Sequence, residues 1–329
     1  MIVLGAGIVG LFTALLLRQR GVEVTVFDPA VQAARQSSWA GGGIVCPLWP
    51  WEEPRPIQRW ARQAHDLYPG WAARLLTDTG IDIEYRRTGI DWSLTPTQLA
   101  HAEAWHRQWQ LPYALTDMGL RSPELGQVRN PRLGRALAAA AVHAGVTMRL
   151  GETARPHCRG GRVVGVITAD AALHKADAVI VAAGAWSAQV LSTVGIESDI
   201  HPVKGQMLLL APQVDAVRLG TVRISRSVYL IPRADGQVLA GSTIERAGFD
   251  TTVTDDAQRQ LLGAAMALWP ELAAYQPVGQ WAGLRPGSAD IPQVGPTAMP
   301  GLWLHAGHFR NGITLAPATA EDLALKLLG

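Results

Sequence analysis

Cysteine, lysine and long apolar runs are scarce in this sequence. Its two cysteines, Cys46 and Cys158, lie far apart and form no CxxC pair, which argues against a disulfide framework, a zinc site or an iron–sulfur centre. No apolar run reaches the ~18 residues of a membrane-spanning helix, and no basic leader with a cleavage site follows Met1. We therefore expect a cytoplasmic protein without a signal peptide and without membrane association.

Neither sign of charge is in large excess. The 29 Lys and Arg residues nearly balance the 27 Asp and Glu residues, and only three of the 29 are lysine. A nucleic-acid-binding protein usually gathers a larger basic excess on one stretch, so we expect no nucleic-acid partner. His101 and His106 lie five residues apart on a predicted helix, a poor spacing for two ligands on one face, so no metal site is predicted. The length of 329 residues suggests about two domains.

The first thirty residues have the pattern of a dinucleotide-binding βαβ unit. A short apolar run leads into Gly5, Gly7 and Gly10, a predicted helix follows over 11–20, and an alternating strand ends at Asp28. The three glycines allow a tight turn, close approach of a pyrophosphate to the backbone, and close packing of helix on strand. The helix N-terminus offers N–H groups to phosphates, and Asp28 can accept hydrogen bonds from a ribose. This unit alone does not distinguish FAD from NAD.

The remaining pattern mixes helices with strands. We predict helices over 57–80, 95–109, 130–144 and 254–269, and strands over 81–84, 89–94, 146–150, 163–168, 176–182, 203–210, 222–224, 228–232 and 237–241. The apolar strand over 176–182 ends in small residues, including Gly184, which let a chain pass close to a bound cofactor. Features of the nucleotide domain therefore recur far along the chain. The sequence thus predicts that another domain interrupts the nucleotide-binding domain.

Three polar residues of the second half are candidates for ligand binding. Tyr229 lies inside a predicted strand, and Arg285 and Arg310 are flanked by apolar residues and glycines. An arginine in such surroundings needs an anionic partner, and a ligand carboxylate matches its planar fork. A structural ion pair would satisfy it as well, and spacing alone leaves both interpretations open.

Several segments together resemble the FAD-dependent D-amino-acid oxidase superfamily, and within it the glycine oxidases of the thiamine-thiazole pathway. The most specific of them is the run His-Phe-Arg-Asn-Gly-Ile-Thr-Leu-Ala-Pro-Ala-Thr, which begins at His308. The matching segments are spread over the whole chain: 5–10, 37–44, 182–187, 202–206, 229–233, 281–286 and 308–318.

The resemblance implies an α/β chain, α+β overall, with two domains. A Rossmann-like FAD-binding domain with the βαβ unit would comprise residues 1–82, 127–198 and 286–329. A substrate-binding domain built on a large antiparallel sheet would comprise residues 83–126 and 199–285. FAD is expected to be bound non-covalently, because the tail holds no cysteine that could attach the flavin.

The resemblance also implies the roles of individual residues. Arg285 would bind the substrate carboxylate bidentately, Tyr229 would add a hydrogen bond to it, and Arg310 would line the site near the flavin. Ser227 and Gly43 replace bulkier residues of the glycine oxidase pattern, so a roomier pocket is expected. The expected cofactor-binding residues are Gly5, Gly7, Ile8, Val9, Gly10, Asp28, Pro29, Gln36, Ser37, Gly41, Gly42, Gly43, Ala154, Gly184, His308, Phe309, Arg310, Asn311, Gly312, Ile313 and Thr314.

The activity that the resemblance implies is oxidation of glycine, and also of sarcosine and small D-amino acids, by hydride transfer to flavin N5. The products would be an imine, then glyoxylate and ammonia, and hydrogen peroxide formed from oxygen. Two alternatives keep the fold: a dehydrogenase with an electron acceptor other than oxygen, and an FAD oxidoreductase that modifies tRNA. A non-catalytic FAD-binding protein is a further alternative, and a homo-oligomer is left open.

Overall fold

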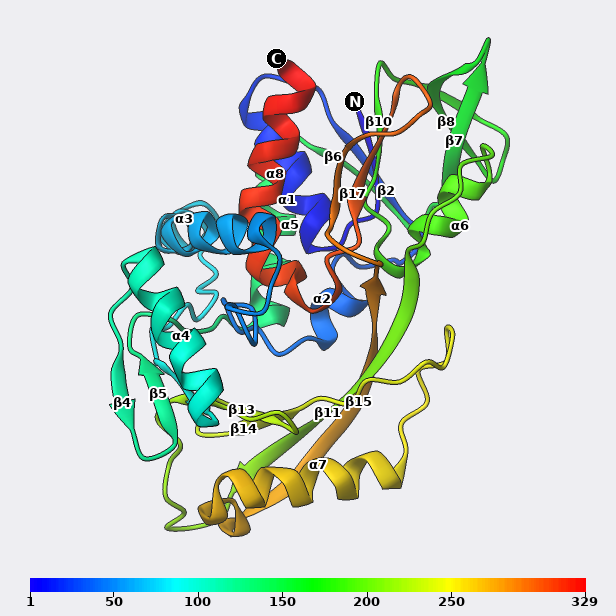
Figure 1. Cartoon of the computed structure of the whole chain (residues 1–329). Helices are drawn as coiled ribbons and strands as arrows, with labels where there is room; N and C mark the ends of the chain where they lie inside the picture. The colour runs from blue at the N-terminus through cyan, green and yellow to red at the C-terminus, as the bar shows by residue number, and fades with distance from the viewer.

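The computed structural model describes residues 1–329 and is organised around two large sheets (Figure 1). The first has six strands in the order β16-β17-β10-β1-β2-β6, and all neighbours are parallel except β16 and β17. A parallel sheet is normally covered on both faces. Its strands are β1 (Ile2–Leu4), β2 (Thr25–Asp28), β6 (Thr147–Leu150), β10 (Val179–Val181), β16 (Gln293–Pro296) and β17 (Leu302–Ala306).

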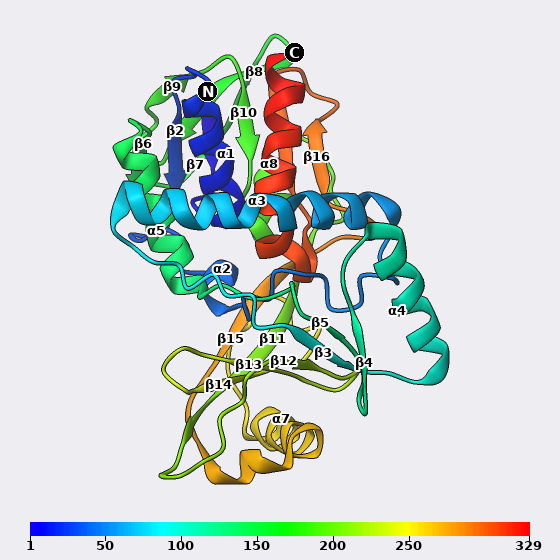
Figure 2. The same cartoon turned by 90° about the vertical axis from the view of Figure 1, so that its left-hand side faces the viewer.

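Helices cover one face of this sheet, and a small sheet with one short helix covers the other. In β1, Val3 packs in the helical core, whereas Ile2 and Leu4 pack in a second core with Val163 and Val166, as the alternation of a strand requires. Figure 2 shows α3 lying across α1, α5 and α8. The covering elements are α1 (Ile8–Gln19), α3 (Arg55–Thr79), α5 (Asn130–His143), α8 (Gly312–Leu328), β7 (Ala154–Arg159), β8 (Arg162–Thr168), β9 (Leu173–Lys175) and α6 (Ser187–Ser192).

The second sheet has eight strands in the order β15-β11-β14-β13-β12-β3-β5-β4, with antiparallel neighbours except for β12 and β3. Side chains alternate across it: Leu208 and Leu230 pack with α7, whereas Met207 and Tyr229 point to the opposite core. Its elements are β3 (Ile90–Ser93), β4 (Ala114–Thr116), β5 (Gly119–Ser122), β11 (His201–Pro212), β12 (Val222–Ile224), β13 (Tyr229–Pro232), β14 (Val238–Gly241), β15 (Tyr275–Gly287), and the helices α4 (Pro96–Trp109) and α7 (Asp255–Leu268).

Strands β11 and β15 connect the two layers. They pair antiparallel from His201 opposite Gly287 to Pro212 opposite Tyr275. Figure 1 shows the two strands running from the region of the six-stranded sheet down to α7. Short elements at the junction complete the chain: α2 (Ser37–Ala40), η1 (Gly184–Trp186), η2 (Pro270–Ala274) and η3 (Phe309–Asn311).

The predicted mixed α/β class is confirmed, and the predicted helices and most predicted strands are present within a few residues of their expected bounds. The predicted strand over 81–84 is wrong. Glu84 has φ of 53°, outside the extended region, and the Ile83 carbonyl accepts from the Arg129 N–H instead of pairing in a sheet. No helix combines the length and the apolar character that a membrane crossing needs.

Candidate active site

A cavity of about 580 Å³ lies where the two layers meet. Its walls come from the β1–α1 turn, the end of β2, α2 and the glycines after it, η1, β11, β13, β15 and η3. All of the residues predicted for the site line this cavity except Gly10, Asn311 and Thr314. The structure thus brings together residues that are spread from Gly5 to Ile313 in the sequence.

The β1–α1 turn forms a cradle that only glycine permits. Gly5 has φ of 116°, and a Cβ there would lie 2.3 Å from the Ala182 carbonyl oxygen. A Cβ on Gly10 would lie 2.0 Å from the Gly5 carbonyl oxygen, which explains why Gly10 supports the turn from behind the cavity. Helix α1 begins after Gly7 with no acidic residue in its first turn. The Ile8 N–H donates to Ser38 Oγ, and the N–H groups that follow it are available to an anion. This arrangement fits a pyrophosphate.

Asp28 ends β2 beside this cradle. Its Oδ2 accepts from the Ala6 N–H at 2.7 Å and its Oδ1 accepts from the Ala30 N–H at 2.8 Å. Each carboxylate oxygen has a second lone pair, so Asp28 is held in place and can still accept hydrogen bonds from a ribose. Ala154 lines the same cavity together with Glu152 and Thr153.

Arg285, on β15, is a partly buried cation whose hydrogen-bond partners are all neutral. Its Nη2 donates to Ser242 Oγ at 2.6 Å, and its Nη1 donates to the carbonyl oxygens of Thr243 at 3.1 Å and Lys204 at 3.3 Å. The guanidinium lies over Gly205, where a Cβ would lie only 2.0 Å from Nη2. Burial is the main effect that lowers the pKa of Arg285. None of these partners neutralises the charge, so an anion in the cavity would complete the site.

Arg310 and Tyr229 line the same cavity. Arg310, in η3, forms no ion pair in the structure; burial lowers its pKa, and the nearby Tyr229 and Glu53 oppose this shift. The Tyr229 hydroxyl donates to Met207 Sδ at 3.3 Å. Tyr229 also raises the pKa of Arg285, against the lowering that burial causes. A phenol and two cations therefore converge, which is an arrangement suited to one carboxylate.

A buried histidine pair lies behind this group. His308 lines the cavity and its Nε2 is 3.2 Å from Thr319 Oγ1, while His305 Nδ1 is 2.8 Å from Thr13 Oγ1. Burial lowers the pKa of His308 to about 3. Both rings are therefore neutral at neutral pH, and they add no charge beside a bound flavin.

The residues around His308 divide into cavity wall and support. Helix α8 begins at Gly312, so the N–H groups of its first turn are directed toward the cavity end of the helix. Thr314 Oγ1 donates to the Ile44 carbonyl at 3.1 Å, and Asn311 Nδ2 donates to Glu53 Oε1 at 3.0 Å. Asn311 and Thr314 therefore hold neighbouring segments in place instead of lining the cavity.

The glycine-rich loop at 41–43 is fixed by Arg233. Its Nη2 donates to the Gly42 carbonyl at 2.8 Å and its Nη1 donates to Gln127 Oε1 at 2.8 Å. A Cβ on Gly43 would lie 2.2 Å from the Val128 carbonyl oxygen, and Ser227 is exposed and does not line the cavity. Gly43 lines the cavity whereas Ser227 does not, so the expected widening stays a prediction at Gly43 and finds no support at Ser227.

Sequence reasoning missed several residues of the cavity wall. Met207, Cys46 and Leu48 form part of it, as do Gly205 and Arg35. Gly205 carried a usable signal, because a glycine inside an apolar strand often marks close approach of another group. The apolar residues carried none, since they do not differ in the sequence from ordinary core positions. No group of His, Cys, Asp or Glu side chains is placed to hold a metal ion.

The fold and this cavity define a flavin-dependent oxidoreductase. The model of the FAD dependent oxidoreductase family, DAO, matches residues 1–325, and the chain belongs to this family. FAD is accordingly its cofactor. The glycine cradle, Asp28 and the N-terminus of α1 fit the nucleotide half of FAD. The cavity extends from them to Tyr229, Arg285 and Arg310.

Individual proteins of known identity are also similar to this chain along most of its length. A glycine oxidase of Pseudomonas aeruginosa is 41% identical over 98% of this chain and 93% of its own length. A bifunctional protein ThiO/ThiG of Nostoc sp. is 32% identical over 98% of this chain, which spans 52% of that protein. The crystal structure of glycine oxidase from Geobacillus kaustophilus has a TM-score of 0.89 at 26% identity, covering 98% of this chain and 94% of that one.

Proposed function

We propose that this protein is an FAD-dependent oxidase of glycine, acting also on sarcosine and small D-amino acids, and that it serves thiamine thiazole synthesis. The observation that carries the proposal is the partly buried Arg285, which lines the cavity and whose three hydrogen-bond partners are neutral. Its charge, with Arg310 and Tyr229 beside it, suits a substrate with one carboxylate. The similarity to glycine oxidases supports the choice of glycine.

In the proposed reaction the protein binds, orients and shields the substrate. Arg285 holds the carboxylate bidentately, Tyr229 donates a hydrogen bond to it, and the α-carbon is thereby directed toward the flavin. FAD, when bound, supplies the redox chemistry by accepting a hydride from that carbon. No side chain needs to act as acid or base if the amine enters neutral, and the neutral His308 is consistent with this. The substrate leaves as an imine, which water converts to an oxo-acid and ammonia, while oxygen is reduced to peroxide.

The proposed cofactor contacts follow the cavity wall. Gly5, Gly7 and the first turn of α1 would hold the pyrophosphate, and Asp28 would hold the ribose. Ala154 would contact the adenine side, and the residues at 36–43 and 308–313 would surround the flavin half, with FAD remaining non-covalent. These contacts remain predictions, which are supported by the shape of the cradle and by the lining of one continuous cavity.

The division into domains is also proposed. Residues 1–82, 127–198 and 286–329 would form the FAD-binding domain, and residues 83–126 and 199–285 the substrate-binding domain. The strands of the two large sheets support this division, since those of the eight-stranded sheet lie between Ile90 and Gly287. Oxygen as the electron acceptor, a cytoplasmic location and a homo-oligomer belong to the same proposal.

The decisive experiment is anaerobic addition of glycine to the purified yellow protein, followed by air and a peroxide assay. Bleaching and then peroxide is the expected result. Bleaching without peroxide would replace the oxidase by a dehydrogenase, and a flavin that no small amino acid bleaches would refute the substrate class. Arg285→Leu should keep the flavin spectrum and lose turnover. Arg259→Leu, at an exposed ion pair with Asp256 on α7, is the matched control and should behave as wild type.

A further inference from the structure

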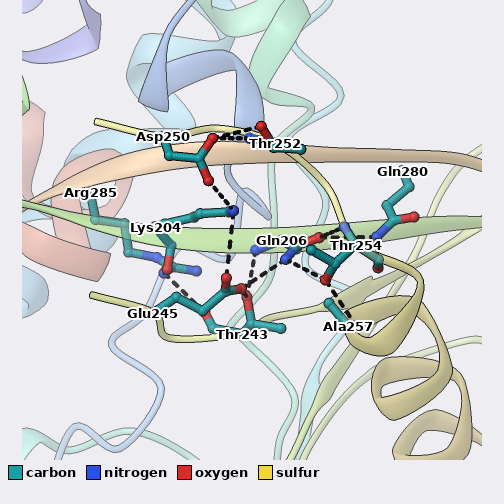
Figure 3. A network of polar contacts seen from close by, with 10 residues as sticks. All are labelled: Lys204, Gln206, Thr243, Glu245, Asp250, Thr252, Thr254, Ala257, Gln280 and Arg285. Carbon is teal, nitrogen blue, oxygen red and sulfur yellow. Dashed lines mark hydrogen bonds and ion pairs between the residues drawn. The ribbon is translucent and has the colours of Figure 1, made fainter. Parts of the chain in front are cut away.

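A polar network centred on the buried side chains of Lys204 and Gln206 lies directly behind Arg285. It joins β11 to the segment of residues 242–254, which connects β14 to α7 and which we call the strap (Figure 3). Most of the strap is exposed: Ile244, Phe249 and Asp250, for example, all have exposed side chains. Its position therefore depends on polar contacts with β11 more than on burial of its own apolar groups.

Lys204 is the centre of this network. Its side chain is only 3% exposed, yet it carries an ammonium group. Nζ lies 3.0 Å from Asp250 Oδ2 and 3.6 Å from Glu245 Oε2, so one cation binds two carboxylates of the strap. Figure 3 shows Lys204 between Asp250 on one side and Glu245 on the other. Removing one partner from a buried ion pair leaves an uncompensated charge, which is strongly unfavourable.

Gln206, two residues further along β11, makes a second set of contacts with the strap. Its Nε2 donates to Glu245 Oε1 at 2.9 Å, and its Oε1 accepts from the Thr254 N–H at 2.9 Å. Its own backbone N–H donates to Thr243 Oγ1 at 2.8 Å. Lys204 and Glu245 also exchange backbone hydrogen bonds, at 2.9 and 3.0 Å. The strap is therefore tied to β11 at both of its ends.

The first residues of the strap are the partners that hold Arg285. Ser242 Oγ accepts from Nη2 and the Thr243 carbonyl accepts from Nη1. The Lys204 carbonyl is the third acceptor of the guanidinium. Every hydrogen bond that orients Arg285 thus comes from β11 or from the strap that Lys204 holds.

The strap also reaches the cofactor side of the cavity. The ring of Phe249 lies 5.5 Å from the ring of Trp186, at an interplanar angle of 31°. Trp186 belongs to η1 and lines the cavity. One segment therefore contacts both the residue that receives the carboxylate and a wall of the cavity that receives the cofactor.

We propose that Lys204 is a positioning residue of this enzyme, which, by binding Glu245 and Asp250, holds the strap so that Ser242 and Thr243 direct the Arg285 guanidinium at the substrate carboxylate. The inference rests on the proposed function. It assigns Lys204 no contact with the substrate, and Lys204 does not line the cavity.

The test measures carboxylate binding separately from turnover. Acetate is titrated into the holoenzyme and its Kd is read from the change in the flavin spectrum, and then KM and kcat for glycine are measured. Lys204→Met should raise the acetate Kd and the glycine KM about tenfold, because a clamp displaced by a fraction of an ångström loses alignment. The value of kcat at saturating glycine should change much less. Lys326→Met, which removes an exposed ion pair with Asp322, is the matched control and should leave all three values unchanged.

A second variant makes the test independent of folding. Asp250 is 51% exposed, so Asp250→Asn should fold normally and raise the acetate Kd about threefold. Asp256→Asn, at the exposed pair with Arg259, is its control. Wild-type Kd and KM in Lys204→Met, or a wild-type Kd in Asp250→Asn if Lys204→Met fails to fold, would overturn the proposal. If wild-type holoenzyme binds acetate but glycine never bleaches it, the proposed function fails while the acetate titrations still decide the role of Lys204.

Discussion

Gly205→Ala should impair substrate binding without unfolding the protein. Gly205 lies on β11 directly beneath the Arg285 guanidinium, and an added Cβ would lie 2.0 Å from Nη2, 2.1 Å from Nη1 and 2.2 Å from Cζ. An ordinary contact begins at 3.4 Å, so the guanidinium must retreat by roughly 1.4 Å. The atoms that must move are the far end of a flexible side chain, whereas the backbone of the strand can stay in place.

The size of the effect follows from the hydrogen bonds that the shift breaks. The Arg285 bonds to Ser242 Oγ at 2.6 Å and to the Thr243 carbonyl at 3.1 Å cannot both survive such a movement. A hydrogen bond that involves a charged group contributes about 1.5–3 kcal/mol, and ~1.4 kcal/mol corresponds to a factor of about ten. A guanidinium displaced from these partners also loses one of its hydrogen bonds to the substrate carboxylate. That loss raises KM for glycine at least about tenfold, and poorer alignment lowers kcat as well.

Stability should change little in this variant. Overpacking costs about 1–3 kcal/mol, and replacing glycine in a strand returns about 0.5–1 kcal/mol of chain entropy. Gly263→Ala is the matched control, because it lies on α7 and its added Cβ meets no atom within 4 Å. We expect wild-type kinetics for the control, and for Gly205→Ala a raised acetate Kd together with a raised glycine KM. A wild-type acetate Kd in Gly205→Ala would show that Arg285 does not bind the carboxylate from this position.

Three further predictions test the cofactor cradle and the buried groups. Gly10→Ala places a methyl group 2.0 Å from the Gly5 carbonyl oxygen, so the purified variant should lack flavin colour; a yellow variant with full FAD content would contradict the cradle. Burial raises the pKa of the Cys46 thiol, so a disulfide reagent should modify it only after unfolding in urea, and rapid labelling of Cys46 in the native protein would refute its burial. Burial lowers the pKa of His308 to about 3 from 6.5. Between these two pH values the unfolded chain binds a proton at this residue and the folded chain does not. The stability present above pH 6.5 is therefore lost as the pH falls toward 3. The free energy of unfolding should drop by about 3 kcal/mol between about pH 7.5 and about pH 4.5 through this group, and urea titrations of His308→Phe should show a correspondingly shallower pH dependence; an unchanged slope would exclude His308 as the cause.

The sequence was sufficient where the determinants of structure are local. Gly5, Gly7 and Gly10 with the acidic end of β2 predict the βαβ unit, because each residue meets a requirement within a few residues of itself. The predicted strands of the eight-stranded sheet were found by apolar alternation and by the turn at 234–236. Helix α8 was not predicted as an element, since Pro317 interrupts its helical pattern.

Other parts of the fold depend on pairing between distant segments. Strand β15 contains Pro277, Gly279 and Gly283 and shows no apolar alternation, yet its backbone pairs with β11 along its whole length. The convergence of Arg285 with Tyr229 could be inferred only from resemblance, since it requires β15 and β13 to be placed in one sheet. The neutral character of the Arg285 partners could not be predicted at all, because a sequence does not show which polar atoms surround a charge.

The pairing of β11 with β15 also limits how the molecule can move. A hydrogen-bonded ladder runs from His201 opposite Gly287 to Pro212 opposite Tyr275, so the same two paired strands belong to both layers and connect them rigidly. A hinge motion that separates the two layers would have to bend the paired strands next to Arg285 and break their backbone hydrogen bonds. Access to the cavity therefore does not depend on separating the two layers, because this ladder can stay intact while segments outside it move. Entry of substrate and exit of the imine are then local events, during which the carboxylate clamp stays on a fixed support.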